Sequence, residues 1–449
     1  MTRPARYQAL EPMPVAPAPN RLVRWTFVLM IFSIPWEYPG RSFPIEIPTL
    51  TAAIFLLTTF FQPRACYARR PAALFWFALY IYAFVVAAVW NARRAVATDL
   101  NHADYWLEVS RLFLLELECV LVFWALYNLL RSPRIARTGL LTLAVACAAL
   151  AILPFLGIAR TSHVQWGGGE RVTALGQNAN NAAMILAAGI VALLGLEYGP
   201  ERPPIRPKWL IWPVIMLIGL SIVETASRGG TLALCAGLAA LMFSNVRTIW
   251  TAVRSALVAV LAIGLIVFAT YKSDLMRRRF EESVENGSLA GRERIYPGLW
   301  QMFKQRPVLG WGPINNKYEL GIRLDERHWP RRDAHNLVLE VLTATGLVGT
   351  VPFLAGIGLC VAGAWRGRRS THGFLPIALM GVVLIANMSG DWVISKLLWL
   401  VLAYGLASLG YPREAAPPRG PPLRSGGRLA GWEPSRVPRA STQPLAPKL

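Results

Sequence analysis

The stretch RRDAHNLVLEVLTATGLVGT, residues 331–350, places two arginines, an acid and a histidine at the start of a long apolar run, residues 335–364. A helix needs about 20 mostly apolar residues to cross the hydrocarbon core of a bilayer. The run therefore predicts a membrane-spanning helix, with the polar residues at its water-facing end. This arrangement indicates a polar site at the surface of a bilayer.

The composition of the whole chain agrees with a protein that crosses the membrane several times. Of 449 residues, 54% are hydrophobic and 16% are charged, and the mean hydropathy is +0.40, so the chain is too apolar to cover itself with water-compatible surface. The formal net charge of +21 would suggest a nucleic-acid partner for a soluble protein. In a membrane protein, basic residues gather in cytoplasmic loops instead, so we expect no nucleic-acid partner.

The cysteines and the N-terminal region exclude two further classes. The five cysteines lie in or beside apolar runs without CxxC spacing, so we expect neither a disulfide framework nor a zinc site. The first apolar run, Leu22–Trp36, contains Arg24 and leads into EYPGRSF. Because no small-residue cleavage site follows, we interpret this run as a retained first span rather than a signal peptide.

The hydropathy pattern predicts an all-α protein with about twelve membrane-spanning helices. The candidate spans are Leu22–Trp36, Pro48–Gln62, Pro71–Trp90, Leu112–Leu130, Thr138–Ala159, Asn181–Leu196, Trp209–Val223, Gly229–Asn245, Ser255–Tyr271, His335–Ala364, Gly373–Ser389 and Trp392–Tyr411. Arginine and lysine clusters fall in alternate connections and in both termini, which places both termini in the cytoplasm.

These spans divide the chain into five parts. We expect a cytoplasmic arm (1–21), nine spans (22–271), a long, partly helical outer loop (272–334), three spans (335–411) and a disordered cytoplasmic tail rich in Pro, Gly, Ser and Arg (412–449). Residues 272–332 of the loop hold 13 Lys and Arg against 8 Asp and Glu. Long loops are exempt from the orientation rule, so this charge favours an anionic partner. The alternative is a solvated loop with incidental charge.

Acid pairs for a divalent cation are missing from the sequence. It contains six aspartates but no DxD and no HExxH motif, and metal-dependent transfer usually uses paired acids. The segment DLNHAD, residues 99–104, is more typical of a solvated turn between spans. We therefore expect neither a metal site nor another cofactor.

Arginines at the outer surface are the first candidates for chemistry. Arg228 precedes two glycines at the start of a span, and guanidinium and helix-start N–H groups both donate to phosphate oxygens. Arg228 is equally compatible with snorkelling to lipid headgroups. Arg292 and Arg294 stand just before an amphipathic stretch that could lie against the membrane surface. The other candidates for binding a pyrophosphate or lipid phosphate, with these two, are Arg277, Arg278 and Arg279 after the ninth span, and Arg331 and Arg332.

His335 is the candidate base. It stands at a predicted helix start with Asp333 as a plausible N-cap, and the positive helix end disfavours an imidazolium. A neutral histidine accepts a proton, although a histidine that only hydrogen-bonds at an interface fits the same pattern. Asp391, at the outer mouth between the last two spans, could orient His335. Four charges inside spans, Glu116, Glu118, Glu340 and Lys396, need partners within the bundle.

Three motifs together resemble the O-antigen ligase and polymerase superfamily of bacterial polytopic glycosyltransferases. They are SRGG at residues 227–230, GRERIYPGLW with RPVLGWG within residues 291–312, and AHNLVLEVLTATGLVG at residues 334–349. The resemblance is greatest to the lipopolysaccharide O-antigen ligases. It implies a GT-C-like fold in the bacterial inner membrane, with an active site facing the periplasm.

The resemblance also implies substrates and roles. The members move a polysaccharide from undecaprenyl pyrophosphate to lipid A-core, with no metal and no ATP. By position in the motifs, the essential arginines fall on Arg228 and Arg292, with Arg294 as a rival, the histidine on His335 and the late acid on Asp391. An O-antigen polymerase, a protein O-oligosaccharide ligase and a lipid-linked oligosaccharide transporter remain alternatives, the last because buried charges also suit transport.

Overall fold

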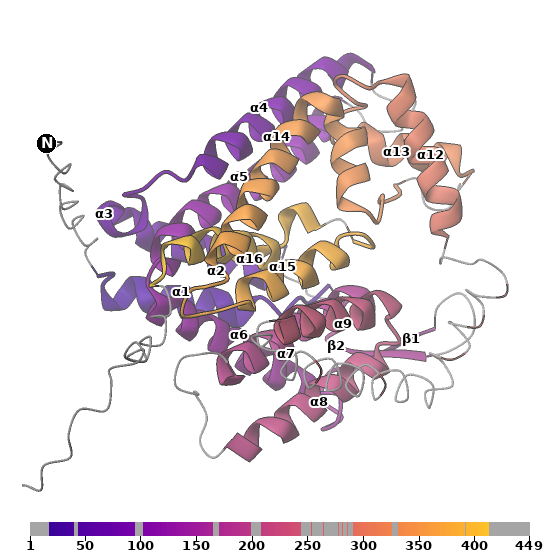
Figure 1. The fold of residues 1–449 in the computed structure, drawn as a ribbon. Helices are drawn as coiled ribbons and strands as arrows, with labels where there is room; N and C mark the ends of the chain where they lie inside the picture. Colours follow the sequence, from indigo (N-terminus) through magenta and orange to yellow (C-terminus); the bar gives the residue numbers. More distant parts are fainter. Residues whose placement is uncertain are drawn as a thin grey trace, which may run out of the picture. The chain divides into compact units, whose positions relative to one another are not determined.

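The computed structural model describes residues 18–39, 44–94, 102–164, 170–198, 208–243, 291–325, 331–390 and 392–412, together with Val253, Gly264, Arg277, Glu281 and Glu285. These residues are mostly helical (Figure 1). The expectation of a purely helical chain is wrong at one place. Strands β1 (Arg160–Val164) and β2 (Glu170–Ala174) pair as an antiparallel hairpin between two helices.

The described helices follow in this order. The first half of the chain holds α1 (Arg21–Ser33), α2 (Ile47–Phe60), α3 (Pro63–Cys66), α4 (Ala72–Asn91), η1 (Ala92–Arg94), α5 (His102–Leu130), α6 (Pro133–Ile152), α7 (Ala179–Tyr198), η2 (Lys208–Leu210) and α8 (Ile211–Glu224). The second half holds α9 (Arg228–Phe243), α12 (Arg292–Gln305), α13 (Asn315–Arg323), α14 (Leu337–Gly367), α15 (Leu375–Ala386), η3 (Trp392–Ile394), α16 (Lys396–Ala407) and η4 (Ser408–Gly410).

Multiple helices suited to a bilayer indicate an integral membrane protein. Among the described residues, five helices are long and apolar enough to cross a membrane: Ala72–Asn91, Asp104–Leu130, Pro133–Ile152, Ala179–Tyr198 and Leu337–Gly367. Shorter apolar helices, including α2, α8, α9, α15 and α16, accompany them. Every predicted span contains a described helix except Ser255–Tyr271, of which the structure describes only Gly264. The number twelve is not confirmed, because the short helices fall below the length that a bilayer requires.

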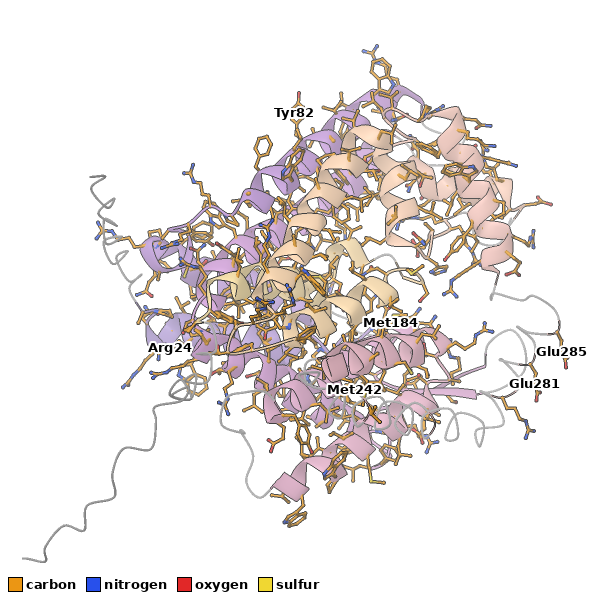
Figure 2. All side chains as sticks on the ribbon, viewed as in Figure 1. Arg24, Tyr82, Met184, Met242, Glu281 and Glu285 are labelled. Atoms are coloured by element: carbon orange, nitrogen blue, oxygen red, sulfur yellow. The ribbon has the colours of Figure 1, made fainter. Side chains whose placement is uncertain are left out.

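The side chains separate an outward surface from a packed interior. Tyr82 on α4 is 66% exposed and, like Arg24 on α1, points away from the helices (Figure 2). An aromatic ring and an arginine on the outer surface of apolar helices are suited to lipid and its headgroups. Helix α7 is the most buried of the long apolar helices and packs against α6, α8, α9 and α15.

Close packing of α9 on α7 fixes the start of α9. A Cβ atom placed on Gly230 would lie 2.3 Å from the Cβ of Ala183 on α7. The two backbones therefore approach more closely than any side chain at residue 230 permits, as small residues allow between membrane helices. This contact places Arg228, the first residue of α9, beside the beginning of α7.

Helix α14 is broken within its apolar run. Gly346 has φ 61° and ψ −161°, outside the helical region. The break leaves backbone groups that a membrane segment must satisfy with other partners. Residues 307–312, which we call the strap, supply them: Trp311 N donates to Thr343 O (2.8 Å) and Leu347 N donates to Pro307 O (2.8 Å). The strap thus ties the segment that carries α12 to the middle of α14.

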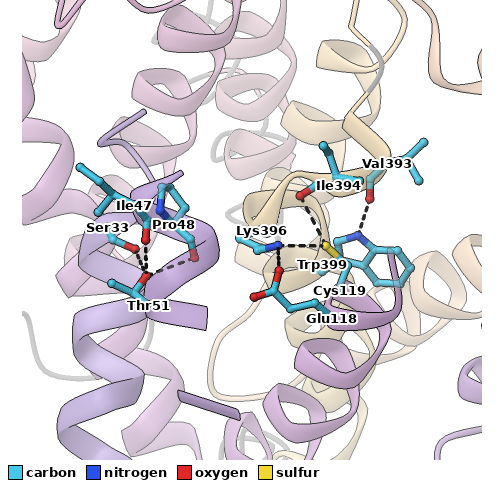
Figure 3. A network of polar contacts seen from close by, with 10 residues as sticks. All are labelled: Ser33, Ile47, Pro48, Thr51, Glu118, Cys119, Val393, Ile394, Lys396 and Trp399. Atoms are coloured by element: carbon cyan, nitrogen blue, oxygen red, sulfur yellow. Dashed lines mark hydrogen bonds and ion pairs between the residues drawn. The ribbon is translucent and has the colours of Figure 1, made fainter. Parts of the chain in front are cut away.

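Two of the charges predicted inside spans form a buried ion pair. Lys396 Nζ on α16 lies 2.5 Å from Glu118 Oε2 on α5 and 3.5 Å from Cys119 Sγ (Figure 3). Close by, Trp399 Nε1 donates to Val393 O (2.6 Å). The pairing joins α5 to α16 and satisfies the requirement that charge in an apolar bundle has a partner.

Candidate functional site

The connector after α15, residues 387–390, receives contacts from two segments that the sequence singled out. Arg292 Nη2, at the first residue of α12, donates to Ser389 O (3.1 Å). The Tyr296 hydroxyl, one turn later on α12, lies 2.9 Å from Met388 O and 3.3 Å from His335 O. Leu337 N, two residues after His335, donates to Asn387 O (2.9 Å). The connector therefore brings the start of α12 and the start of α14 together.

Gly229, the residue after Arg228, packs against the same connector. A Cβ atom on Gly229 would lie 2.7 Å from Ser389 Oγ, so the first turn of α9 abuts the residue whose carbonyl accepts from Arg292. Arg228 itself is half-buried. Three of the residues predicted from the sequence, Arg228, Arg292 and His335, thus lie on segments that meet at residues 387–390.

The glycine-rich start of α9 is less open to a phosphate than the sequence suggested. Ser227 caps the helix, because Gly230 N donates to Ser227 Oγ (3.1 Å) and Thr231 N donates to Ser227 O (3.1 Å). Both N–H groups are therefore already used. Fewer backbone donors therefore remain at this helix start, which increases the importance of the Arg228 guanidinium and its fixed fork of donors for any anion bound there.

His335 precedes α14 rather than beginning it. The helix starts at Leu337, and its N-cap is Asn336, whose Oδ1 accepts from Val338 N and Leu339 N at 3.1 Å each. The prediction of Asp333 as N-cap is wrong, because Asp333 pairs instead with Lys317 of α13. His335 is half-buried and has φ 50°, a left-handed backbone conformation that costs about 1–3 kcal/mol outside glycine.

Asp333, two residues before His335, is an ionised carboxylate. Partial burial alone would raise the pKa of the Asp333 carboxyl, but the Lys317 ammonium 2.7 Å away outweighs burial, and His335 and Arg331 act in the same direction. The net pKa of Asp333 lies below its ordinary value. Asp333 is therefore ionised at neutral pH and pairs with the Lys317 ammonium.

The remaining arginine candidates point elsewhere. Arg294 is exposed and Nη2 donates to Leu324 O (3.3 Å). Arg331 forms an ion pair with Glu108 of α5 (2.8 Å). Both arginines were predicted to bind phosphate, and the contacts described here are with other residues of the protein.

Arg332 is half-buried, and its backbone N–H donates to Lys317 O (3.1 Å). Arg277 lies 3.6 Å from Glu281. Arg278, Arg279 and Asp391 lie outside the described residues. Within the described ranges, no group of three or more His, Cys, Asp or Glu side chains is arranged to hold a metal ion.

The amphipathic face of α12 is covered by protein, whereas the sequence predicted that it could lie against the membrane surface. Ile295, Leu299 and Met302 are buried against Leu320 of α13 and Ala334, forming a small apolar core. A helical period shows that one face is apolar but not which surface covers it. The described part of the outer loop, residues 291–325, is folded rather than a loose solvated segment.

Sequence reasoning missed a polar cluster at the start of α7. Arg171 of β2, 3% exposed, donates to Asn180 Oδ1 (2.9 Å). The next residue, Asn181, accepts from Trp392 Nε1 (2.9 Å) and also interacts with Glu37, whose burial and whose proximity to Glu46 raise its pKa to about 7. The run GQNANNAAM, residues 176–184, places these amides directly before an apolar helix, a signal that could have identified them.

Comparison with known protein families identifies the middle of the chain. Residues 213–354 match the family model described as O-antigen ligase. The match includes most of α8, all of α9, α12 and α13, and the first part of α14, and therefore Arg228, Arg292 and His335. The resemblance drawn from the motifs is confirmed over these residues. No curated protein matches the chain.

Proposed function

We propose that this integral membrane protein, which carries an O-antigen ligase domain at residues 213–354, transfers O-antigen polysaccharide from undecaprenyl pyrophosphate to lipid A-core at the periplasmic face of the inner membrane. One observation carries the proposal. Arg292 and the first turn of α9 both contact Ser389, while Tyr296 links the adjacent Met388 to His335. These contacts support a site in which Arg228 and Arg292 supply positive charge and His335 accepts a proton.

Arg228 and Arg292 stabilise the leaving group. A polyprenyl pyrophosphate departs as a stable anion, so it requires positive charge rather than a general acid. Arg228 and Arg292 neutralise the charge that grows on the pyrophosphate as the anomeric C–O bond breaks. The contact of Arg294 with Leu324 O, away from the connector, favours Arg292 over its rival.

His335 is the base that activates the acceptor. Its imidazole takes the proton from a sugar hydroxyl of lipid A-core as that oxygen attacks the anomeric carbon. His335 has a left-handed backbone directly before α14, and Asn336 rather than His335 caps that helix. Asp391 remains our candidate for orienting His335. A single displacement inverts the anomeric centre, and a product with retained configuration would contradict it.

The deciding experiment is reconstitution. Purified protein is incubated with polyprenyl-pyrophosphate glycan and lipid A-core, and the products are examined for a lipopolysaccharide of higher mass. His335→Ala and Arg292→Ala should lower the rate by about 10² to 10⁴, the usual cost of removing a positioned base or charge clamp. Arg294→Ala is the matched comparison on the same helix and should lose far less. The reverse order of the two arginine variants would transfer the role to Arg294.

The same assay separates the alternatives. Longer lipid-linked glycans made without lipid A-core would identify a polymerase. Transfer to a protein serine would identify a protein O-oligosaccharide ligase. Movement of the lipid-linked glycan across liposomes without any new glycosidic bond would identify a transporter and would refute the proposal.

A further inference from the structure

Arg171, a buried arginine of the β-hairpin, is hydrogen-bonded to the turn that precedes Arg228. Arg171 Nε donates to Thr225 O (2.7 Å), and Nη2 donates to Asn180 Oδ1 (2.9 Å). Ser227 Oγ donates to the same Asn180 oxygen (3.0 Å). Arg171, Thr225 and Ser227 are 3%, 2% and 0% exposed. Three elements, β2, the start of α7 and the α8–α9 turn, therefore meet in one hydrogen-bonded cluster.

The turn that this cluster holds is strained. Ala226 has φ 48°, a left-handed conformation that a side chain disfavours. A residue in this region persists only where its surroundings enforce it. Here the enforcing contacts fall on both sides of the residue, at Thr225 O and at Ser227 Oγ. Thr225 O is also one of the carbonyls that the end of α8 leaves without a helical partner.

The cluster continues directly into the first turn of α9. Ser227 is at once the partner of Asn180 and the N-cap, since Gly230 N donates to its Oγ (3.1 Å). Arg228 lies between this cap and Gly229, which packs against Ser389. A shift of the cap would therefore change the position of the Arg228 backbone relative to the connector.

We infer that Arg171 is a positioning residue that sets the direction of Arg228 by holding the left-handed turn at Ala226, an inference that rests on the function proposed above. Arg171 does not bind the donor itself. Its Nε and Nη2 are committed to Thr225 and Asn180, and its side chain is buried. Arg171 therefore affects the donor only by fixing the position of the turn.

The test compares two arginines of the same hairpin. Arg171→Ala should lower kcat/KM for the polyprenyl-pyrophosphate donor by about 10- to 100-fold, because an ångström-scale misplacement of a positioning group has effects of that order. The donor KM should rise, whereas the KM for lipid A-core should stay the same. Arg160→Ala removes an exposed arginine from β1 and should leave both constants unchanged.

A second variant keeps the test decisive if Arg171→Ala folds poorly. In Arg171→Ala/Ala226→Gly, glycine adopts the left-handed conformation without a side-chain penalty. This double variant should recover part of the lost donor kcat/KM. A merely structural role of Arg171 would reduce the folded fraction, lower kcat and leave both KM values unchanged. That result, or an equal loss in Arg160→Ala, would overturn the inference.

Hydrogen exchange tests the cluster without any assay of transfer. In the full chain in detergent, Arg171→Ala should speed exchange of the Gly230 and Thr231 amides, which the Ser227 cap protects. Arg160→Ala should not change it. If the wild-type protein makes no glycan product, the proposed function fails while the exchange result still decides whether Arg171 holds the turn. Unchanged exchange in Arg171→Ala overturns the inference.

Discussion

Replacing Gly346 with alanine should release the strap from α14. A Cβ atom at residue 346 would lie 2.2 Å from Val308 O, a backbone atom that cannot rotate away. The φ of 61° with ψ of −161° lies in a region that is essentially restricted to glycine. Alanine also favours an unbroken helix. The substitution therefore acts on both the break and the segment that fills it.

The magnitude follows from the contacts at the break. Forcing alanine into this conformation costs about 1–3 kcal/mol. Two hydrogen bonds lie directly at the clash, from Leu347 N to Pro307 O (2.8 Å) and from Val348 N to Val308 O (3.2 Å), and each contributes about 0.5–1.5 kcal/mol net. The sum is a loss of about 2–6 kcal/mol in the stability of the strapped conformation.

The assay pairs unfolding with hydrogen exchange in detergent. Gly346→Ala should unfold at a lower temperature, and the Trp311 amide, which donates to Thr343 O, should exchange faster. Gly358→Ala is the matched control on the same helix, where an added Cβ meets nothing within 4 Å. That variant should be neutral or more stable by about 0.5–1 kcal/mol. Equal behaviour of the two variants would refute the account of the break.

Two further substitutions probe charges away from the strap. Glu118→Gln should destabilise the protein by about 3–5 kcal/mol, because it leaves the Lys396 ammonium buried without its counter-charge; adding Lys396→Met should restore part of the loss, and thermal unfolding of both variants measures the difference. Glu37 has a pKa raised to about 7, so the folded state binds its proton more tightly than the unfolded state, and stability should fall as pH rises from about 4.5 to 7. Glu37→Gln should flatten this slope in unfolding curves recorded across that range, and an unchanged slope would exclude Glu37 as its source.

The sequence predicted most of the helices because an apolar run in a regular helix satisfies its backbone hydrogen bonds within itself, whatever surrounds it. The amphipathic period likewise located α12, with Arg292 as its first residue. The surface that covers α12 was not predictable, since α13 reaches it only after the chain turns back. Asp333 failed as a helix cap for a similar reason, because Lys317, 16 residues earlier, is its partner in the fold.

The break at Gly346 and the role of Arg171 were beyond sequence reasoning. Gly346 sits in a run with the hydropathy of a continuous span, and the strap that fills the break comes from residues 307–312. Arg171 was outside the motifs and lies 54 residues before Thr225, the residue it contacts. Both features depend on backbone atoms of distant segments, which leave no local pattern in either segment.

Backbone carbonyls of the connector, rather than its side chains, accept the hydrogen bonds that bring the segments of the candidate site together. Ser389 O accepts from Arg292, and Asn387 O accepts from Leu337 N. A carbonyl survives any substitution at its own residue, so these contacts depend on the connector's side chains only through the path of its backbone. The side chain that fixes the path is Asn387, whose Oδ1 accepts from Trp392 N (3.0 Å) and whose Nδ2 donates to Val383 O (2.8 Å). Because this buried amide closes the connector at both ends, Arg292 and the His335 segment share a single structural dependence although 43 residues separate them in the chain.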